Sequence, residues 1–196
     1  MNKLLILTTA VLISMAGRAH AGPITITNPG FETGGFTGWT TTPAASGSAF
    51  NVVSGFPHSG QYSALFTGNT AGSYDAISQT LTTTPGDLVD VTFWLENGGP
   101  ASSSDFQALW NGVVVFDTLN ADHFPYTLES FIVPATSSSS TLTFRAYYLR
   151  SFDFFLDDVS ATESPAAVPE PASLTLTGLG LFAIAAQLRR RRTLRM

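Results

Sequence analysis

Cysteine is absent from the whole chain of 196 residues. Its absence excludes disulfide bonds as a source of stability and excludes a thiol as a catalytic nucleophile. An exported domain of this size must then depend on its hydrophobic core, and a bound metal ion is the other device that could tie it together.

Basic residues are nearly absent from the central part of the chain. Between residues 22 and 168, only Arg145 and Arg150 stand against 13 acidic residues, for a formal net charge of −11. Lys and Arg supply most of the affinity for nucleic acid, so nucleic acid is excluded as a partner. Anionic membranes and anionic polysaccharides would be repelled, whereas neutral glycans and divalent cations remain candidate ligands. The other basic residues lie at the two ends of the chain: Lys3, Arg18, Arg189, Arg190, Arg191, Arg192 and Arg195.

Helical patterns are also scarce between residues 22 and 168. Short runs rich in Val, Phe, Tyr, Thr and Ile alternate instead with Gly, Pro, Ser and Asn, which is typical of strands and turns. About ten strands at this spacing predict an all-β fold, a two-sheet antiparallel sandwich of the jelly-roll type. We expect strands at 24–27, 49–54, 61–67, 75–82, 87–96, 105–110, 113–117, 127–133, 140–149 and 153–161.

The alternation of side chains predicts which face of two strands is buried. Val91, Phe93 and Leu95 alternate with polar or exposed positions, and so does the series Leu142, Phe144, Ala146 and Tyr148. A period of two is typical of a sheet with one buried face. The pair Asn111-Gly112 predicts a two-residue hairpin turn with positive φ, and Pro85-Gly86 predicts a type II turn.

The first 21 residues have the pattern of a secretory signal peptide. A single Lys3 precedes an apolar run from Leu4 to about Ala16, and Ala19-His20-Ala21 supplies a small-residue cleavage site. The run is short for a membrane span of about 20 residues, so we expect cleavage after Ala21.

The last 28 residues have the pattern of a membrane-stop signal. Residues 173–188 are 16 residues without a charge, which is marginal for a transmembrane helix across about 30 Å of hydrocarbon. The cluster Arg189, Arg190, Arg191 and Arg192 follows and would stay on the cytoplasmic side. Pro169 and Pro171 keep the preceding segment extended and accessible to a processing enzyme. An ordinary tail anchor is the alternative.

The residues Val168, Pro169, Glu170 and Pro171, followed by the apolar stretch and the arginines, resemble the PEP-CTERM sorting signal. The resemblance implies a Gram-negative bacterium that makes extracellular polysaccharide and biofilm. It also implies an exosortase as the processing partner, a transient stay in the inner membrane, and a mature protein at the cell surface or outside the cell. The chain then divides into a signal peptide at 1–21, a domain at 22–161, a linker at 162–168 and a sorting signal at 169–196.

The stretches Asn28–Trp39 and Phe154–Ala161 resemble the opening and closing segments of jelly-roll carbohydrate-binding modules that contain calcium. In that group, Glu of the first motif and Asp of the last hold a structural calcium ion. The resemblance therefore implies Glu32 and Asp157 as ligands, with Asp158 as the neighbour that could replace Asp157 and Asn28 as a further oxygen donor. Calcium takes six to eight oxygen ligands, which carboxylates and loop carbonyls can supply.

Adjacent strand residues point to opposite faces, so we expect only one of Asp157 and Asp158 to face the ion. The alternative is that both aspartates simply end a strand and that Glu32 is solvated.

Catalysis has few candidates in this sequence. His58 and His123 lie in loop-like contexts, and nothing in the sequence brings Glu96 and Glu129 together as a glycosidase pair. We therefore expect no catalytic residues and a non-enzymatic surface or matrix protein that binds neutral polysaccharide. A secreted glycan hydrolase or lyase on the same fold is the alternative. Outward-facing aromatic side chains are the candidate ligand contacts: Trp94, Tyr126 and Tyr147.

Overall fold

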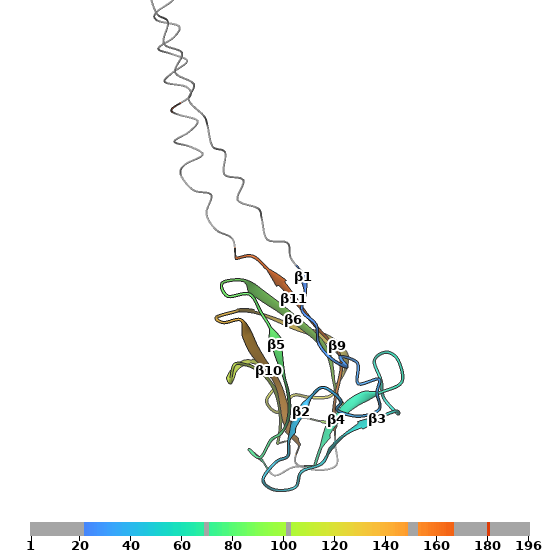
Figure 1. The fold of residues 1–196 in the computed structure, drawn as a ribbon. Helices are drawn as coiled ribbons and strands as arrows, with labels where there is room; N and C mark the ends of the chain where they lie inside the picture. The colour runs from blue at the N-terminus through green and yellow to red at the C-terminus, as the bar shows by residue number, and fades with distance from the viewer. Residues whose placement is uncertain (1–21, 69–70, 101–102, 149–152, 167–179, 181–196) are drawn as a thin grey trace, which may run out of the picture. The chain divides into compact units, whose positions relative to one another are not determined.

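The computed structural model describes residues 22–68, 71–100, 103–148, 153–166 and 180. Within this part of the chain, eleven β-strands form two antiparallel sheets that face each other (Figure 1). The expected all-β sandwich is confirmed. The expected signal peptide, transmembrane helix and arginine cluster lie outside the described residues. Among the residues described, no helix is long and apolar enough to cross a membrane.

The first sheet has six strands, and we call it the six-stranded sheet. Its central strand is the last of the domain, β11, which lies between β4 and β6 and also pairs with the short β1. The order along the sheet is β3-β4-β11-β6-β9, with bounds β1 Gly22–Pro23, β3 Phe50–Val53, β4 Ser63–Thr67, β6 Leu88–Asn97, β9 Phe124–Pro134 and β11 Asp153–Ser164.

The second sheet has five strands, and we call it the five-stranded sheet. Its central strand is β10, which pairs with β5 on one side and β7 on the other. The order is β2-β5-β10-β7-β8, with bounds β2 Thr40–Thr42, β5 Asp75–Thr82, β7 Ser104–Trp110, β8 Val113–Asp117 and β10 Ser139–Tyr148. Except for the consecutive pairs β3-β4 and β7-β8, neighbouring strands in each sheet are distant in sequence, as in a jelly roll.

The core lies between the two sheets and follows the expected alternation. Phe93 on β6 is fully buried and packs against Phe144 on β10, with ring centroids 5.0 Å apart. Edge-to-face pairs of this kind add to the burial of apolar area. The inward series on both strands is confirmed as buried, with zero exposure at Val91, Phe93, Leu95, Leu142, Phe144, Ala146 and Tyr148.

Two turns have the backbone that their residues predict. Asn111 and Gly112 join β7 to β8 with φ angles of 50° and 82°, as a type I′ hairpin turn requires. Gly86 has φ 95° after Pro85, in agreement with a type II turn.

The expected strand at 24–27 is wrong, and β2 was not expected. Ile24 donates a backbone hydrogen bond to Ala161 of β11 at 2.9 Å, but the chain then leaves that sheet. The backbone of Thr27 bonds instead to the side chain of Gln79 on the other sheet. This crossing between sheets breaks the regular pairing that a strand needs.

Candidate functional site

The loop between β3 and β4, residues 54–62, covers part of the outer face of the six-stranded sheet. The ring of Phe56 packs on Phe155 with centroids 5.0 Å apart, and the His58 ring stacks on Trp94 at 3.8 Å. The carbonyl oxygen of Phe56 accepts a hydrogen bond from the Tyr126 hydroxyl at 2.6 Å. The loop is therefore held against the sheet by rings as well as by backbone contacts.

Two carboxylates hold the backbone of this loop. Glu32 accepts hydrogen bonds from the N–H groups of Gln61 and Tyr62 at 2.9 and 3.0 Å. Asp157 is fully buried and accepts from the N–H groups of His58 and Ser59 at 2.8 and 3.2 Å. Residues from the start, middle and end of the domain thus meet at one place, which we call the carboxylate junction.

Asp158 also reaches the loop, contrary to the expectation that it would face away from Asp157. Its carboxylate contacts His58 Nδ1 at 2.7 Å and accepts from Ser59 Oγ at 2.8 Å. The physical reason is a β-bulge: the register of β11 on β6 shifts between Asp157 and Ser160, and Asp158 has φ 47°. A bulge adds a residue to one strand and redirects its side chain.

The charge of the junction suits a cation. The Cβ that Gly30 lacks would lie 3.3 Å from Asp158 Oδ1 and 3.5 Å from Asp157 Oδ1, so these oxygens converge. Burial, more than any other cause, raises the pKa of Asp157 to about 6, although backbone N–H donors act against the rise. The His58 ring lies beside these carboxylates, with Nδ1 2.7 Å from Asp158 Oδ2.

The carboxylates fit a calcium ion in charge and in ligand type, because calcium prefers oxygen ligands. Among the described residues, however, no three His, Cys, Asp or Glu side chains form a group that could hold a metal by themselves. Carbonyl oxygens would have to complete the set. Calcium at Glu32, Asp157 and Asp158 stays a prediction.

Asn28 has local partners in its own loop. Its side-chain amide donates to the carbonyl of Gly35 at 2.8 Å and accepts from the N–H of Thr33 at 3.2 Å. The residue has φ 52°, a conformation in which Asn is enriched. Its place as a calcium ligand stays a prediction.

The predicted aromatic contacts fall on two different sheets. Trp94 and Tyr126 lie on the outer side of the six-stranded sheet, both half-buried, and His58 covers one ring face of Trp94. Tyr147 lies on the outer side of the five-stranded sheet and is 8% exposed. The structure thus does not bring the three predicted ligand contacts together.

Tyr147 belongs to a group of polar and aromatic side chains that we call the tyrosine–arginine cluster: Tyr74, Asp105, Gln107, Arg145 and Tyr147. The rings of Tyr74 and Tyr147 meet edge to face at 5.1 Å, and the guanidinium of Arg145 lies 4.4 Å above the Tyr74 ring. Arg145 donates two hydrogen bonds to the Gln107 carbonyl oxygen at 2.8 and 2.6 Å.

The pairing of strands explains this arrangement. Arg145 on β10 lies opposite Gln107 on β7, and Tyr147 lies opposite Asp105. Since Phe144 and Ala146 face the core, the odd-numbered side chains face outward. The cluster is therefore one continuous patch on the outer face of two paired strands.

Two groups of the cluster, Tyr74 and Asp105, have raised pKa values. Burial, followed by the neighbouring Asp117, raises the pKa of Asp105 to about 6. Burial and the hydrogen bond to Asp105 raise the pKa of Tyr74 well above its usual value, so its hydroxyl stays protonated and donates to Asp105. Ring faces beside fixed donors and acceptors are typical of a ligand site.

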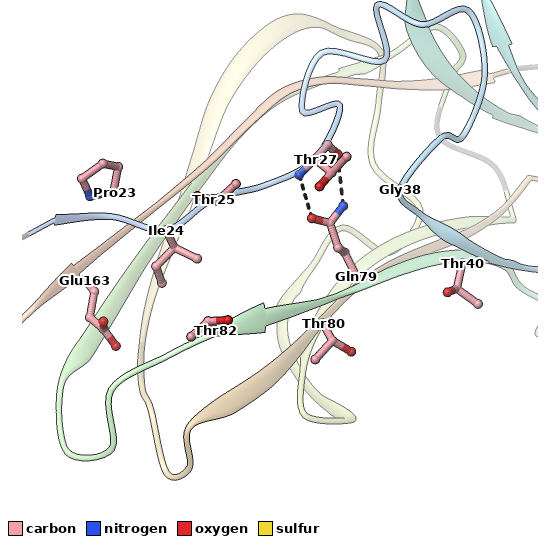
Figure 2. A pocket seen from close by; sticks show the side chains of 10 residues that line it. All are labelled: Pro23, Ile24, Thr25, Thr27, Gly38, Thr40, Gln79, Thr80, Thr82 and Glu163. Carbon is pink, nitrogen blue, oxygen red and sulfur yellow. Dashed lines mark hydrogen bonds between the residues drawn. The ribbon is translucent and has the colours of Figure 1, made fainter.

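A separate groove of about 700 Å³ lies between the segment after β1 and strand β5 (Figure 2). The Gln79 side chain bonds both backbone groups of Thr27 there, and Glu163 accepts from the Thr84 hydroxyl at 3.0 Å. Threonines dominate its lining, and no aromatic ring is among the ten lining residues. The groove therefore lacks the aromatic rings that the tyrosine–arginine cluster contains.

The candidate catalytic residues remain apart. Glu96 is two residues after Trp94 on β6, so both side chains lie on the outer face of the six-stranded sheet. Glu129 on β9 pairs with the core residue Phe93, so its side chain lies on the inner face. The two carboxylates therefore face opposite sides of one sheet. His123 is exposed in the segment between β8 and β9.

Sequence reasoning missed four members of the cluster: Tyr74, Asp105, Gln107 and Arg145. Arg145 could have been found, because it lies two residues before Tyr147 and so shares its face. Gln107 and Asp105 could not, since they join through pairing between strands about 40 residues apart.

Comparison with protein families finds one match, the PEP-CTERM protein-sorting motif at residues 167–192. The chain carries a PEP-CTERM sorting signal. The match covers the predicted Val168, Pro169, Glu170 and Pro171 together with the arginine cluster, and a sorting signal of this kind indicates an exported protein. No curated protein matches this chain.

Solved structures with a similar fold include carbohydrate-binding modules. The CBM22-1 xylan-binding domain of Paenibacillus barcinonensis Xyn10C has a TM-score of 0.53 and 21% identity, over 76% of this chain and 99% of that domain. TmCBM61, solved with β-1,4-galactotriose, has a TM-score of 0.52 and 18% identity, over 69% and 95%. The K3 adhesin domain of Lys-gingipain from Porphyromonas gingivalis has a TM-score of 0.51 and 16% identity, over 73% and 99%. These likenesses establish the jelly-roll fold.

Proposed function

We propose that this chain is an exported, non-enzymatic surface protein that binds polysaccharide without anionic groups at the tyrosine–arginine cluster. The observation that carries the proposal is the cluster itself, two tyrosine rings beside a fixed guanidinium, amide and carboxyl on one sheet face. Such rings suit the apolar faces of sugars, and the polar groups suit their hydroxyls. The sorting motif and the carbohydrate-binding neighbours support export and glycan binding.

Charge supports a neutral ligand over an anionic one. The domain has a net charge of −11, and its described cation beside the rings, Arg145, is already bonded to Gln107. An anionic polysaccharide would meet long-range repulsion without a free cation to offset it.

The test is binding of the purified protein to xylan and to β-1,4-galactan, followed by affinity electrophoresis, with sugar release measured in parallel. We expect retardation by at least one polymer and no release of sugar. Tyr74→Ala should weaken binding about tenfold, because it removes a contact of roughly 1.4 kcal/mol. Trp94→Ala serves as the matched control on the opposite sheet.

Two outcomes would count against the proposal. Turnover of either polymer would favour the alternative, a glycan hydrolase or lyase. Loss of binding in Trp94→Ala with full binding in Tyr74→Ala would move the site to the six-stranded sheet, beside Trp94 and Tyr126.

We also propose that the sorting signal is processed by an exosortase, after a transient stay in the inner membrane. The supporting observation is the motif at residues 167–192. Mass spectrometry of the exported protein tests this. We expect a C-terminus near Pro169, and a chain that still ends beyond Arg192 would contradict the proposal.

A structural calcium ion at the carboxylate junction is the third part of the proposal. Its support is the convergence of Asp157 and Asp158 near Gly30, with Glu32 in the same junction. The ion would neutralise the charge of these three carboxylates. A ligand that binds only the folded state raises its unfolding midpoint. We expect calcium to raise the midpoint relative to chelator, and Glu32→Gln to abolish the difference; an equal midpoint in calcium and chelator would contradict the proposal.

A further inference from the structure

One carboxylate oxygen of the tyrosine–arginine cluster is buried and has no partner. Asp105 is 3% exposed, and its Oδ2 accepts from the Tyr74 hydroxyl and from Gln107 Nε2 at 2.9 Å. Its Oδ1 has no hydrogen-bond partner among the described residues. A buried polar atom without a partner costs about 1–3 kcal/mol, so a ligand group at this position would relieve a defect.

A second carboxyl lies near Asp105. Asp117 on β8 pairs with Gln107, which places it diagonal to Asp105 on the same sheet face, close enough to raise the pKa of Asp105. Both are negative when ionised, and burial together with Asp117 raises the pKa of Asp105 to about 6. A cation in direct contact with both carboxyl groups would offset this repulsion, whereas Arg145 acts on Asp105 only through its nearby charge, which lowers the pKa.

Arg145 does not fill this role. Its Nε and one terminal nitrogen both donate to Gln107, and its guanidinium lies over the Tyr74 ring. In the described part of the chain, it forms no ion pair with either aspartate. Among the described residues Arg145 is the only Lys or Arg, so within this part of the chain a cation in direct contact with the pair would come from a ligand.

The ligands present favour an organic cation over a metal ion. Calcium takes six to eight oxygens, whereas the described residues hold no group of three acidic or imidazole side chains that could bind a metal. A protonated amine needs only three acceptors for its N–H donors. The Tyr74 hydroxyl bonds Asp105 and so lies beside the pair as a further polar group.

We propose that the cluster binds a polysaccharide containing amino sugars, with a protonated primary amine held between Asp105 and Asp117. The inference rests on the proposed function, since it places the ligand in the same cluster. It adds the substrate class: a glycan with free amino groups is preferred over its acetylated, neutral form. The net charge of −11 acts in the same direction, because it draws a polycation toward the domain.

The test compares two ligands that differ only in acetylation. Glucosamine hexasaccharide and N-acetylglucosamine hexasaccharide are titrated into the purified protein by calorimetry at neutral pH and low salt. We expect glucosamine hexasaccharide to bind about tenfold more tightly, with a preference that falls as salt rises.

Variants separate the site from the overall charge. Asp117→Asn is exposed and isosteric, so it should fold normally and reduce the preference to about unity. Asp105→Asn should act in the same way. Asp87→Asn removes one charge from the turn between β5 and β6 and should leave the preference intact.

Each outcome bears on the inference. Equal binding of the two hexasaccharides would overturn it, and so would an equal loss of preference in Asp87→Asn and Asp117→Asn. If xylan or galactan binds while neither hexasaccharide does, the inference fails and the proposed function stands. If no glycan binds at all, both fail.

Discussion

Replacing Asp157 by alanine should destabilise the domain by releasing the loop 54–62. The carboxylate is fully buried and accepts three backbone N–H groups, those of His58, Ser59 and Asp158. Hydrogen bonds to a charged acceptor contribute about 1.5–3 kcal/mol each. Burial works against them and raises the pKa of Asp157 to about 6, a value that already includes the opposing effect of the N–H donors. Because removal of the carboxylate leaves three N–H groups without their acceptor, we expect a loss of about 3 kcal/mol in the free energy of unfolding, less than the sum of the three bonds.

Thermal unfolding followed by circular dichroism measures this loss. For a domain of this size, about 3 kcal/mol lowers the midpoint by roughly 10 °C. Asp87→Ala is the matched control, since it removes the same charge from a half-buried turn position. A midpoint for Asp157→Ala within the error of the control would refute the reasoning, because the loop would then be held by its rings alone.

Three further perturbations have defined outcomes. Gly60→Ala should lower the unfolding midpoint, because Gly60 has φ 65° and an added Cβ would lie 2.3 Å from Glu32 Oε1; an unchanged midpoint would contradict the close approach. Burial raises the pKa of Glu129 above its usual value of 4.5. The protonated side chain therefore contributes stability to the folded state below pH 4.5, and this contribution is lost as the pH rises through the raised pKa. Glu129→Gln should therefore stabilise the protein at neutral pH but not at low pH, and chemical denaturation at the two pH values would reveal a constant difference if this is wrong. Phe93→Ala should cost about 3–5 kcal/mol, since the ring is fully buried against other phenylalanines; a loss below about 1 kcal/mol in urea unfolding would contradict the packing.

Much of the fold could be predicted because its signals are local. The strands at 75–82 and 113–117 have the expected bounds, and the buried face of β10 follows from a period of two. Asn111-Gly112 marks its hairpin because few residues adopt positive φ without strain. The segment 24–27 was wrongly predicted as a strand because its local residue pattern does not reveal that the chain leaves the six-stranded sheet after Ile24.

The candidate sites were predictable only in part. The structure brings Glu32 and Asp157, which the resemblance named as calcium ligands, to one loop, and the bulge in β11 turns Asp158 toward the same loop. Calcium binding there stays a prediction. Trp94 was correctly expected on the outer face, but its cover by His58 depends on the loop between β3 and β4, which folds over the same sheet. Backbone irregularities of this kind leave no periodic trace in the sequence.

The sequence by itself determined the strand pattern, the acidic charge of the domain, the absence of thiols and the sorting signal. Each of these properties depends only on composition or on residues that are neighbours in the chain. Only the tertiary structure decided which side chains share a site. Arg145 meets Gln107, and Asp105 meets Asp117, through the register of paired strands that are distant in the chain. Register is set by the packing of the whole core, so the tyrosine–arginine cluster exists only once the two sheets have closed on each other.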